Sequence, residues 1–147
     1  MNFVLLKESI VVGIYTTIVA LLLIYLFQSI NKTKFHSSIW FFFILGFFKH
    51  FLGYFLNLQT IYCNEGQQCK KIHLHQNLIL NSNVKAIQPS LLENTGEGIV
   101  FVIFGLILTQ LFKIKNTLLN AFLIGFFLHI ISDIVGLHTY FCKYFCA

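Results

Sequence analysis

The sequence contains no arginine and a single proline, and charged residues occupy 10% of its 147 positions. All ten basic residues are lysines without a dense run, which argues against a nucleic-acid partner. So few charges cannot cover the surface of a soluble enzyme, and they also exclude a coiled coil and a disordered chain. The motifs G-x-x-x-x-G-K, G-x-S-x-G and H-E-x-x-H are missing, which disfavours nucleotide-driven pumps and the common hydrolases.

What the chain has instead is hydrophobic residues, at 57% of its positions, with eighteen phenylalanines. A helix needs roughly 20 apolar residues to cross a bilayer. Four stretches approach that length, at residues 10–28, 38–58, 98–112 and 118–137. The first is too long for the apolar core of a signal peptide, so we expect it to be retained. The sequence therefore predicts an all-α integral membrane protein with four transmembrane helices and the lipid bilayer as its partner.

The short connections predict how these helices are oriented. Residues 29–37 and 113–117 contain four lysines and no acid, which marks them as cytoplasmic by the positive-inside rule. The N-terminus, the C-terminus and the polar loop at 59–97 are then lumenal or exoplasmic. The sequon at Asn31 would be glycosylated only in the inverted orientation.

Two segments of the chain resemble each other. Residues 43–63 align without a gap on residues 122–142, and the identities include Gly46 with Gly125, His50 with His129 and Cys63 with Cys142. The preceding helices align at a larger offset, with Glu8 matching Glu97. We therefore predict two tandem parallel helix-hairpin repeats, at 1–63 and 97–147, separated by a lumenal loop at 64–96. Small and polar residues on one side of the second and fourth helices predict that these faces point inward.

Ionisable groups inside the spans are costly and need partners. Lys49 has no charged counterpart in the second repeat, and Asp133 has none in the first. This complementarity predicts an intramembrane ion pair between Lys49 and Asp133 that bridges the two halves. Its simplest role is to fix the register of the helices.

His50 and His129 occupy equivalent depths in the two repeats. Two such histidines can supply both axial nitrogens of a haem b, with nearby glycines making room for the macrocycle. A carboxylate and imidazole metal site that adds Glu8 and Glu97 is disfavoured, because the glutamates open their helices and the histidines lie deeper. The ordinary interpretation of such histidines is a hydrogen-bonded core residue with no cofactor.

The cysteines Cys63, Cys69, Cys142 and Cys146 all follow the second or fourth span on the predicted lumenal side, where disulfides form. The symmetry allows local bridges, Cys63 to Cys69 and Cys142 to Cys146, or a crosslink between the repeats. The local pairs are slightly favoured, and a structural role is expected. The placement of the cysteines resembles the layout of vitamin K epoxide reductases, but the C-x5-C and C-x3-C spacings and the order of the elements depart from that family.

The sequence favours a non-enzymatic structural or accessory component of a membrane or membrane complex. Besides lipid, its expected partner is a second copy in a homodimer or a larger membrane complex. The first alternative is a membrane oxidoreductase that uses haem or thiol-disulfide exchange. The second is a subunit of a small transporter or channel.

Overall fold

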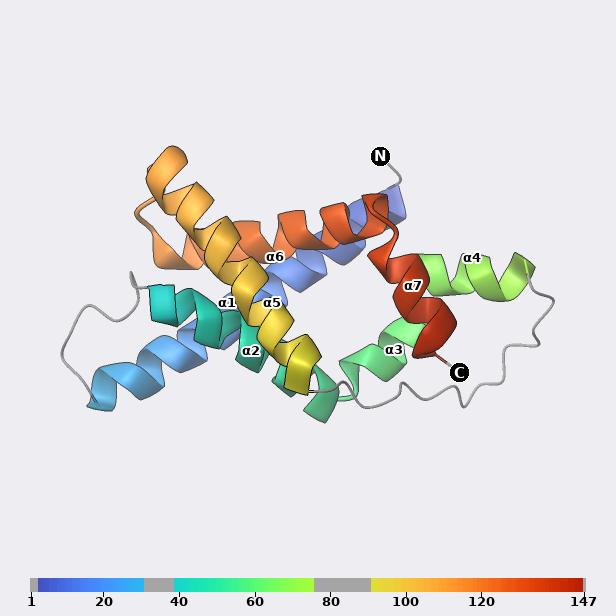
Figure 1. Ribbon diagram of the computed structural model, residues 1–147, viewed down its shortest axis with the longest axis horizontal. Coiled ribbons are helices and arrows are strands. Elements are labelled where there is room, and N and C mark those ends of the chain that lie inside the picture. The colour runs from blue at the N-terminus through green and yellow to red at the C-terminus, as the bar shows by residue number, and fades with distance from the viewer. Residues whose placement is uncertain (1–2, 31–38, 76–90, 147) are drawn as a thin grey trace.

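The computed structural model describes residues 3–30, 39–75 and 91–146, and every regular element within these ranges is helical. The long helices are α1 (Phe3–Ile30), α2 (Ile39–Phe55), α5 (Leu91–Leu106) and α6 (Thr117–Ile134). A π-helical turn, η2 (Ile107–Leu111), extends α5. The short helices α3 (Leu58–Glu65), α4 (Gln67–His75) and α7 (Leu137–Tyr144) lie together at one end of the molecule, at the right of Figure 1.

The long helices have the length and composition of membrane spans. Among the described residues, Phe3–Phe27, Leu91–Leu111 and Thr117–Ile134 each qualify, and α2 with α3 makes a fourth if this bent pair is one span. Large apolar side chains cover their outer faces, as shown by Val11, which is 64% exposed, and Ile134, which is 75% exposed. This surface is compatible with a multi-pass membrane protein.

The long helices pack as two pairs. α1 lies along α6, and α2 lies along α5 (Figure 1). The sequence predicted that one face of the second and one face of the fourth span point inward; in the structure α2 packs mainly on α5, and α6 packs mainly on α1. Glycines permit the close approach: Gly46 of α2 lies against Phe101, and Gly125 of α6 lies against Thr16.

The core between these pairs is apolar and includes Phe41, Phe42, Leu45, Phe101 and Ile124, all of which are fully buried or nearly so. Two hydroxyl groups of α1 are buried, and each donates a hydrogen bond. Ser9 donates to the carbonyl of Leu5, and Thr16 donates to the carbonyl of Val12. Such bonds to the preceding turn allow small polar residues inside an apolar bundle.

The helices differ from the predicted spans at the starts of α1 and α5 and beyond the ends of α2 and α6. α1 begins at Phe3 and α5 at Leu91, each seven residues before the predicted span, so Glu8 and Glu97 lie within helices. α2 ends at Phe55 and α6 at Ile134, close to the predicted ends of the second and fourth spans, and the chain continues as the short helices α3 and α7. The polar loop predicted at 59–97 therefore contains α3, α4 and the first turns of α5.

Candidate functional site

The breaks that follow α2 and α6 place the functional side chains. Asn57, with φ of 56°, ends α2, and Gly136, with φ of 81°, separates α6 from α7. Glycine adopts this left-handed conformation without steric cost, and asparagine tolerates it better than most residues. The chain bends by 71° between α2 and α3. As a result, α3 and α7 bring a cysteine each to the same end of the molecule.

Two disulfides join the short helices. Cys63 of α3 pairs with Cys146, and Cys69 of α4 pairs with Cys142 of α7, with Cα atoms 5.4 and 5.1 Å apart. The local pairs that the sequence favoured slightly are therefore wrong, and both bridges join the first half of the chain to the second, as the alternative prediction had it. The reason is that α4 packs against α7, which brings each cysteine of one half beside a cysteine of the other.

The four sulfur atoms form one buried cluster. Each cysteine is at most 4% exposed, and Tyr62, Ile72 and Phe141 pack around them. The Sγ atoms of Cys69 and Cys146, which belong to different disulfides, are 3.8 Å apart. Cys69, Cys142 and Cys146 also form the one group of His, Cys, Asp or Glu donors with the spacing of a metal site in the described part of the chain. In the disulfide state these sulfurs are not thiolate ligands.

Lys49 and Asp133 do not pair with each other, and each contacts a different residue. The ammonium group of Lys49 is 2.8 Å from Glu97 Oε1, and Asp133 Oδ1 is 3.5 Å from His138 Nδ1. The predicted Lys49 to Asp133 pair is therefore wrong. Lys49 lies on α2, which packs on α5, whereas Asp133 lies on α6, which packs on α1. Because α5 starts earlier than predicted, Glu97 reaches the level of Lys49.

The two predicted histidines each have a polar neighbour from another helix. His50 Nδ1 is 2.7 Å from Asn94 Oδ1 of α5, and His129 Nε2 is 3.5 Å from Glu8 Oε2 of α1. These contacts are those of hydrogen-bonded histidines inside a bundle. A haem between His50 and His129 stays a prediction.

His129 belongs to a series of polar groups in contact with one another, here called the polar chain. Glu8 accepts a hydrogen bond from the backbone N–H of Gln67 at 2.9 Å and contacts His129. The ring of His129 lies 4.4 Å from the ring of His138, between centroids, and His138 contacts Asp133. The chain therefore connects α1, α4, α6 and α7.

His138 is neutral at physiological pH. Its burial lowers the pKa from 6.5 to about 4, and neighbouring His129 acts in the same direction, while Asp133 partly opposes the shift. A neutral His138 carries one N–H donor and one acceptor nitrogen.

A cavity of about 520 Å³ opens beside this polar chain. Its walls are mainly apolar, and both predicted histidines, His50 and His129, contribute to it. The lining residues come from both halves of the chain: Lys7, Glu8, Val11, Val12, Tyr15, Lys49, His50, Gly53, Leu58, Gln59, Ile61, Tyr62, Glu65, Gly66, His129, His138 and Phe141.

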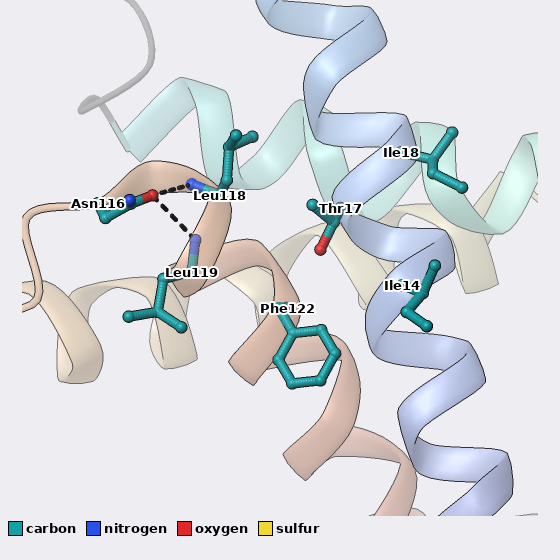
Figure 2. Close-up of a pocket in the computed structure, with 7 residues that line it drawn as sticks. All are labelled: Ile14, Thr17, Ile18, Asn116, Leu118, Leu119 and Phe122. Atoms are coloured by element: carbon teal, nitrogen blue, oxygen red, sulfur yellow. Dashed lines mark hydrogen bonds between the residues drawn. The ribbon is translucent and has the colours of Figure 1, made fainter.

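A second hollow, of about 390 Å³, lies between α1 and the start of α6 (Figure 2). Its walls are apolar except for Thr17 and Asn116. Thr17 donates to the carbonyl of Gly13. Asn116 caps α6 by accepting from the N–H groups of Leu118 and Leu119. Because both polar side chains are engaged in local bonds, this hollow offers no polar group for a specific ligand.

Sequence reasoning missed several residues of the site. Asn94 was assigned to a loop, and Gln59, Tyr62 and His138 were not assigned a role. A signal was present for two of them, because Gln59 and His138 occupy the same position in the repeat alignment. Asn94 gave no such signal, since it lies before the segment that aligns.

No protein-family model matches the chain, and neither a curated protein nor a solved structure shows significant similarity to it.

Proposed function

We propose that the protein is a multi-pass membrane protein built from two tandem helical hairpins, and that it acts as a non-enzymatic structural or accessory component. The observation that carries this proposal is the pair of buried disulfides, each of which joins the first half of the chain to the second. Crosslinks between distant segments restrict the unfolded chain and hold the helices in one arrangement.

Equivalent local geometry supports the tandem repeat. The breaks at Asn57 and Gly136 occupy the same position in the alignment, and the short helices that follow, α3 and α7, have equivalent bounds. Gly46 packs on Phe101, while its counterpart Gly125 packs on α1 at Thr16. The disulfides follow the same relation, since the first cysteine of each half bonds to the second cysteine of the other.

The cysteines also support the proposed orientation. Disulfides persist in oxidising compartments, so we place the end that carries α3, α4 and α7 on the lumenal or exoplasmic side. The connection at 113–117 lies at the opposite end of α5 and α6 and contains Lys113 and Lys115. The other predicted cytoplasmic turn falls at 29–37, most of which lies outside the described residues.

Thiol labelling of the protein in membranes tests the structural role. We expect a maleimide to leave all four cysteines unmodified until the protein is both unfolded and reduced, because the sulfurs are buried. The paired variants Cys69→Ser/Cys142→Ser and Cys63→Ser/Cys146→Ser each remove one bridge. We expect each to lose about 2–4 kcal/mol of stability and to keep its helical content.

A second candidate is thiol-disulfide exchange, favoured by the 3.8 Å between sulfurs of the two bridges. Attack by the thiolate of an external dithiol on one bridge would release a cysteine thiolate, and that thiolate could attack the neighbouring bridge while the dithiol closes to its own disulfide. Rapid labelling of the folded protein after mild reduction would support this candidate and contradict the structural role. Resistance to a small dithiol in the folded state would exclude it.

A further inference from the structure

The cavity of about 520 Å³ has four exposed lining residues, of which Val11 of α1 and Ile61 of α3 are apolar and Lys7 and Glu65 are charged. Val11 and Ile61 are 64% and 55% exposed, which places the apolar part of the mouth between these helices. α1 has the properties of a membrane span. The mouth is therefore suited to entry of a molecule that has both an apolar and a polar part.

The charges around the cavity largely compensate one another. Lys49 pairs with Glu97, and Glu65 pairs with Lys70 at 2.6 Å. The remaining charges belong to Lys7 and Glu8, which have opposite signs and are adjacent in sequence. With no excess of either sign, the cavity favours an uncharged ligand.

Three polar atoms of lining residues are buried without a hydrogen-bond partner among the described residues: Tyr62 Oη, Gln59 Oε1 and His138 Nδ1. The last of these lies 3.5 Å from the carboxylate of Asp133, which leaves Tyr62 and Gln59 for a ligand. The amide nitrogen of Gln59 donates to the carbonyl of His50 at 3.3 Å, which identifies the other atom as the acceptor. A buried polar atom without a partner costs free energy, and a ligand that pairs with it recovers that cost on binding. The cavity therefore offers one donor and one acceptor.

We propose that this cavity binds an uncharged, lipid-soluble alcohol, whose hydroxyl group faces Tyr62 and Gln59 and whose hydrocarbon part lies toward Val11 and Ile61. A hydroxyl group both donates and accepts, so it suits the acceptor on Gln59 and the donor on Tyr62 alike. An anionic head group can accept from Tyr62 but has no proton to give to Gln59. A pure hydrocarbon satisfies neither.

Photo-crosslinking tests the proposal on the full-length, disulfide-bonded protein in phosphatidylcholine nanodiscs. The probe is hexadecanol with a diazirine in its chain, and the adducts are located by mass spectrometry. We expect adducts on cavity residues such as Val11 and Ile61, suppressed by excess hexadecanol and not by hexadecane or hexadecyl sulfate. Adducts spread over all lipid-facing helices, or equal suppression by the three competitors, would overturn the proposal.

Tyr62→Phe is the decisive variant, because it keeps the ring and removes only the hydroxyl. We expect roughly three- to tenfold weaker competition by hexadecanol, the effect of one hydrogen bond. The matched control is Tyr25→Phe, since Tyr25 is 76% exposed on α1 and does not line the cavity. Equal competition in both variants would contradict the assignment.

A second variant covers the case in which Tyr62→Phe fails to assemble. Val11→Trp adds bulk at the exposed mouth without touching a buried hydrogen bond, and we expect it to reduce the Ile61 adduct at least fivefold. An unchanged Ile61 adduct in Val11→Trp would also overturn the proposal. The alcohol site does not depend on the structural role of the disulfides, which the thiol labelling tests separately.

Discussion

Lys49 is held between α2 and α5 by two neighbours. Its ammonium group lies 2.8 Å from Glu97 and 5.4 Å from the centroid of the Phe101 ring. The side chains of Lys49 and Glu97 are 16% and 27% exposed, so solvent screens their attraction only in part. Removing one member of such a pair leaves the other charge without compensation.

Changing Glu97 should therefore destabilise the protein through Lys49. We expect Glu97→Gln to lose about 2–3 kcal/mol of stability, and this loss should shrink when Lys49→Met is present as well. Denaturation in detergent of the single and double variants measures the coupling. Asp133→Asn is the matched control. Coupling of Lys49 to Asp133 in place of Glu97 would contradict the observed pairing.

His138 should make stability depend on pH. Because its folded pKa of about 4 is below the usual 6.5, the unfolded chain takes up the proton first as the pH falls. The stability associated with neutral His138 is complete above pH 6.5 and is lost between pH 6.5 and 4. We expect about 1–2 kcal/mol of loss from pH 7.5 to 5 that is missing in His138→Gln. Parallel pH profiles for the two proteins would contradict this assignment.

At the scale of elements, glycine decides how closely α2 and α5 approach. A Cβ atom at Gly46 would lie 2.8 Å from the carbonyl oxygen of Glu97 and from Phe101, whereas a Cβ at Gly96 would meet nothing within 4 Å. The two positions therefore separate packing from helix propensity.

Alanine at these positions should have opposite effects. We expect Gly46→Ala to lose about 2 kcal/mol through overpacking. Gly96→Ala should gain up to about 1 kcal/mol, because alanine is the better helix former. Thermal unfolding of the two variants under identical conditions provides the comparison. Equal effects would show that α2 and α5 do not meet at Gly46.

The break before α7 depends on the backbone of Gly136. A Cβ at this position would meet nothing within 4 Å, so any cost of substitution comes from its φ of 81°. We expect Gly136→Ala to lose about 1–2 kcal/mol. Gly136→Asn should lose less, because asparagine occupies the equivalent break at position 57. Similar stabilities for wild type and Gly136→Ala would indicate a continuous helix.

Hydrophobic pattern predicted the helical class and the apolar segments, because apolar length is a local property of the chain. It ended the second and fourth spans next to the breaks at Asn57 and Gly136, but it did not predict that the short helices α3 and α7 follow them. It also placed the start of α5 too late, because it assigned Glu93 and Asn94 to a loop. Asn94 is in fact buried beside His50, and only tertiary packing makes a polar residue suitable there.

At the scale of the whole molecule, the sequence predicted which residues matter better than which residues meet. The residues that it singled out lie at or next to the end of the molecule that carries α3, α4 and α7: Lys49, His50, His129, Asp133 and the cysteines. Their partners depend on which helices pack together, and equivalent residues in a repeat leave that choice open. The pairing of α2 with α5 determines the ion pair of Lys49, the pairing of α1 with α6 determines the contact of His129 with Glu8, and the packing of α4 on α7 determines the disulfides.

The connectivity of the disulfides tests this arrangement most directly. The oxidised protein, extracted from membranes with free thiols blocked, would be digested without reduction and its linked peptides identified by mass spectrometry. We expect peptides that join Cys63 to Cys146 and Cys69 to Cys142. Peptides that join Cys63 to Cys69 and Cys142 to Cys146 would contradict the account, because no disulfide would then join the two halves of the chain.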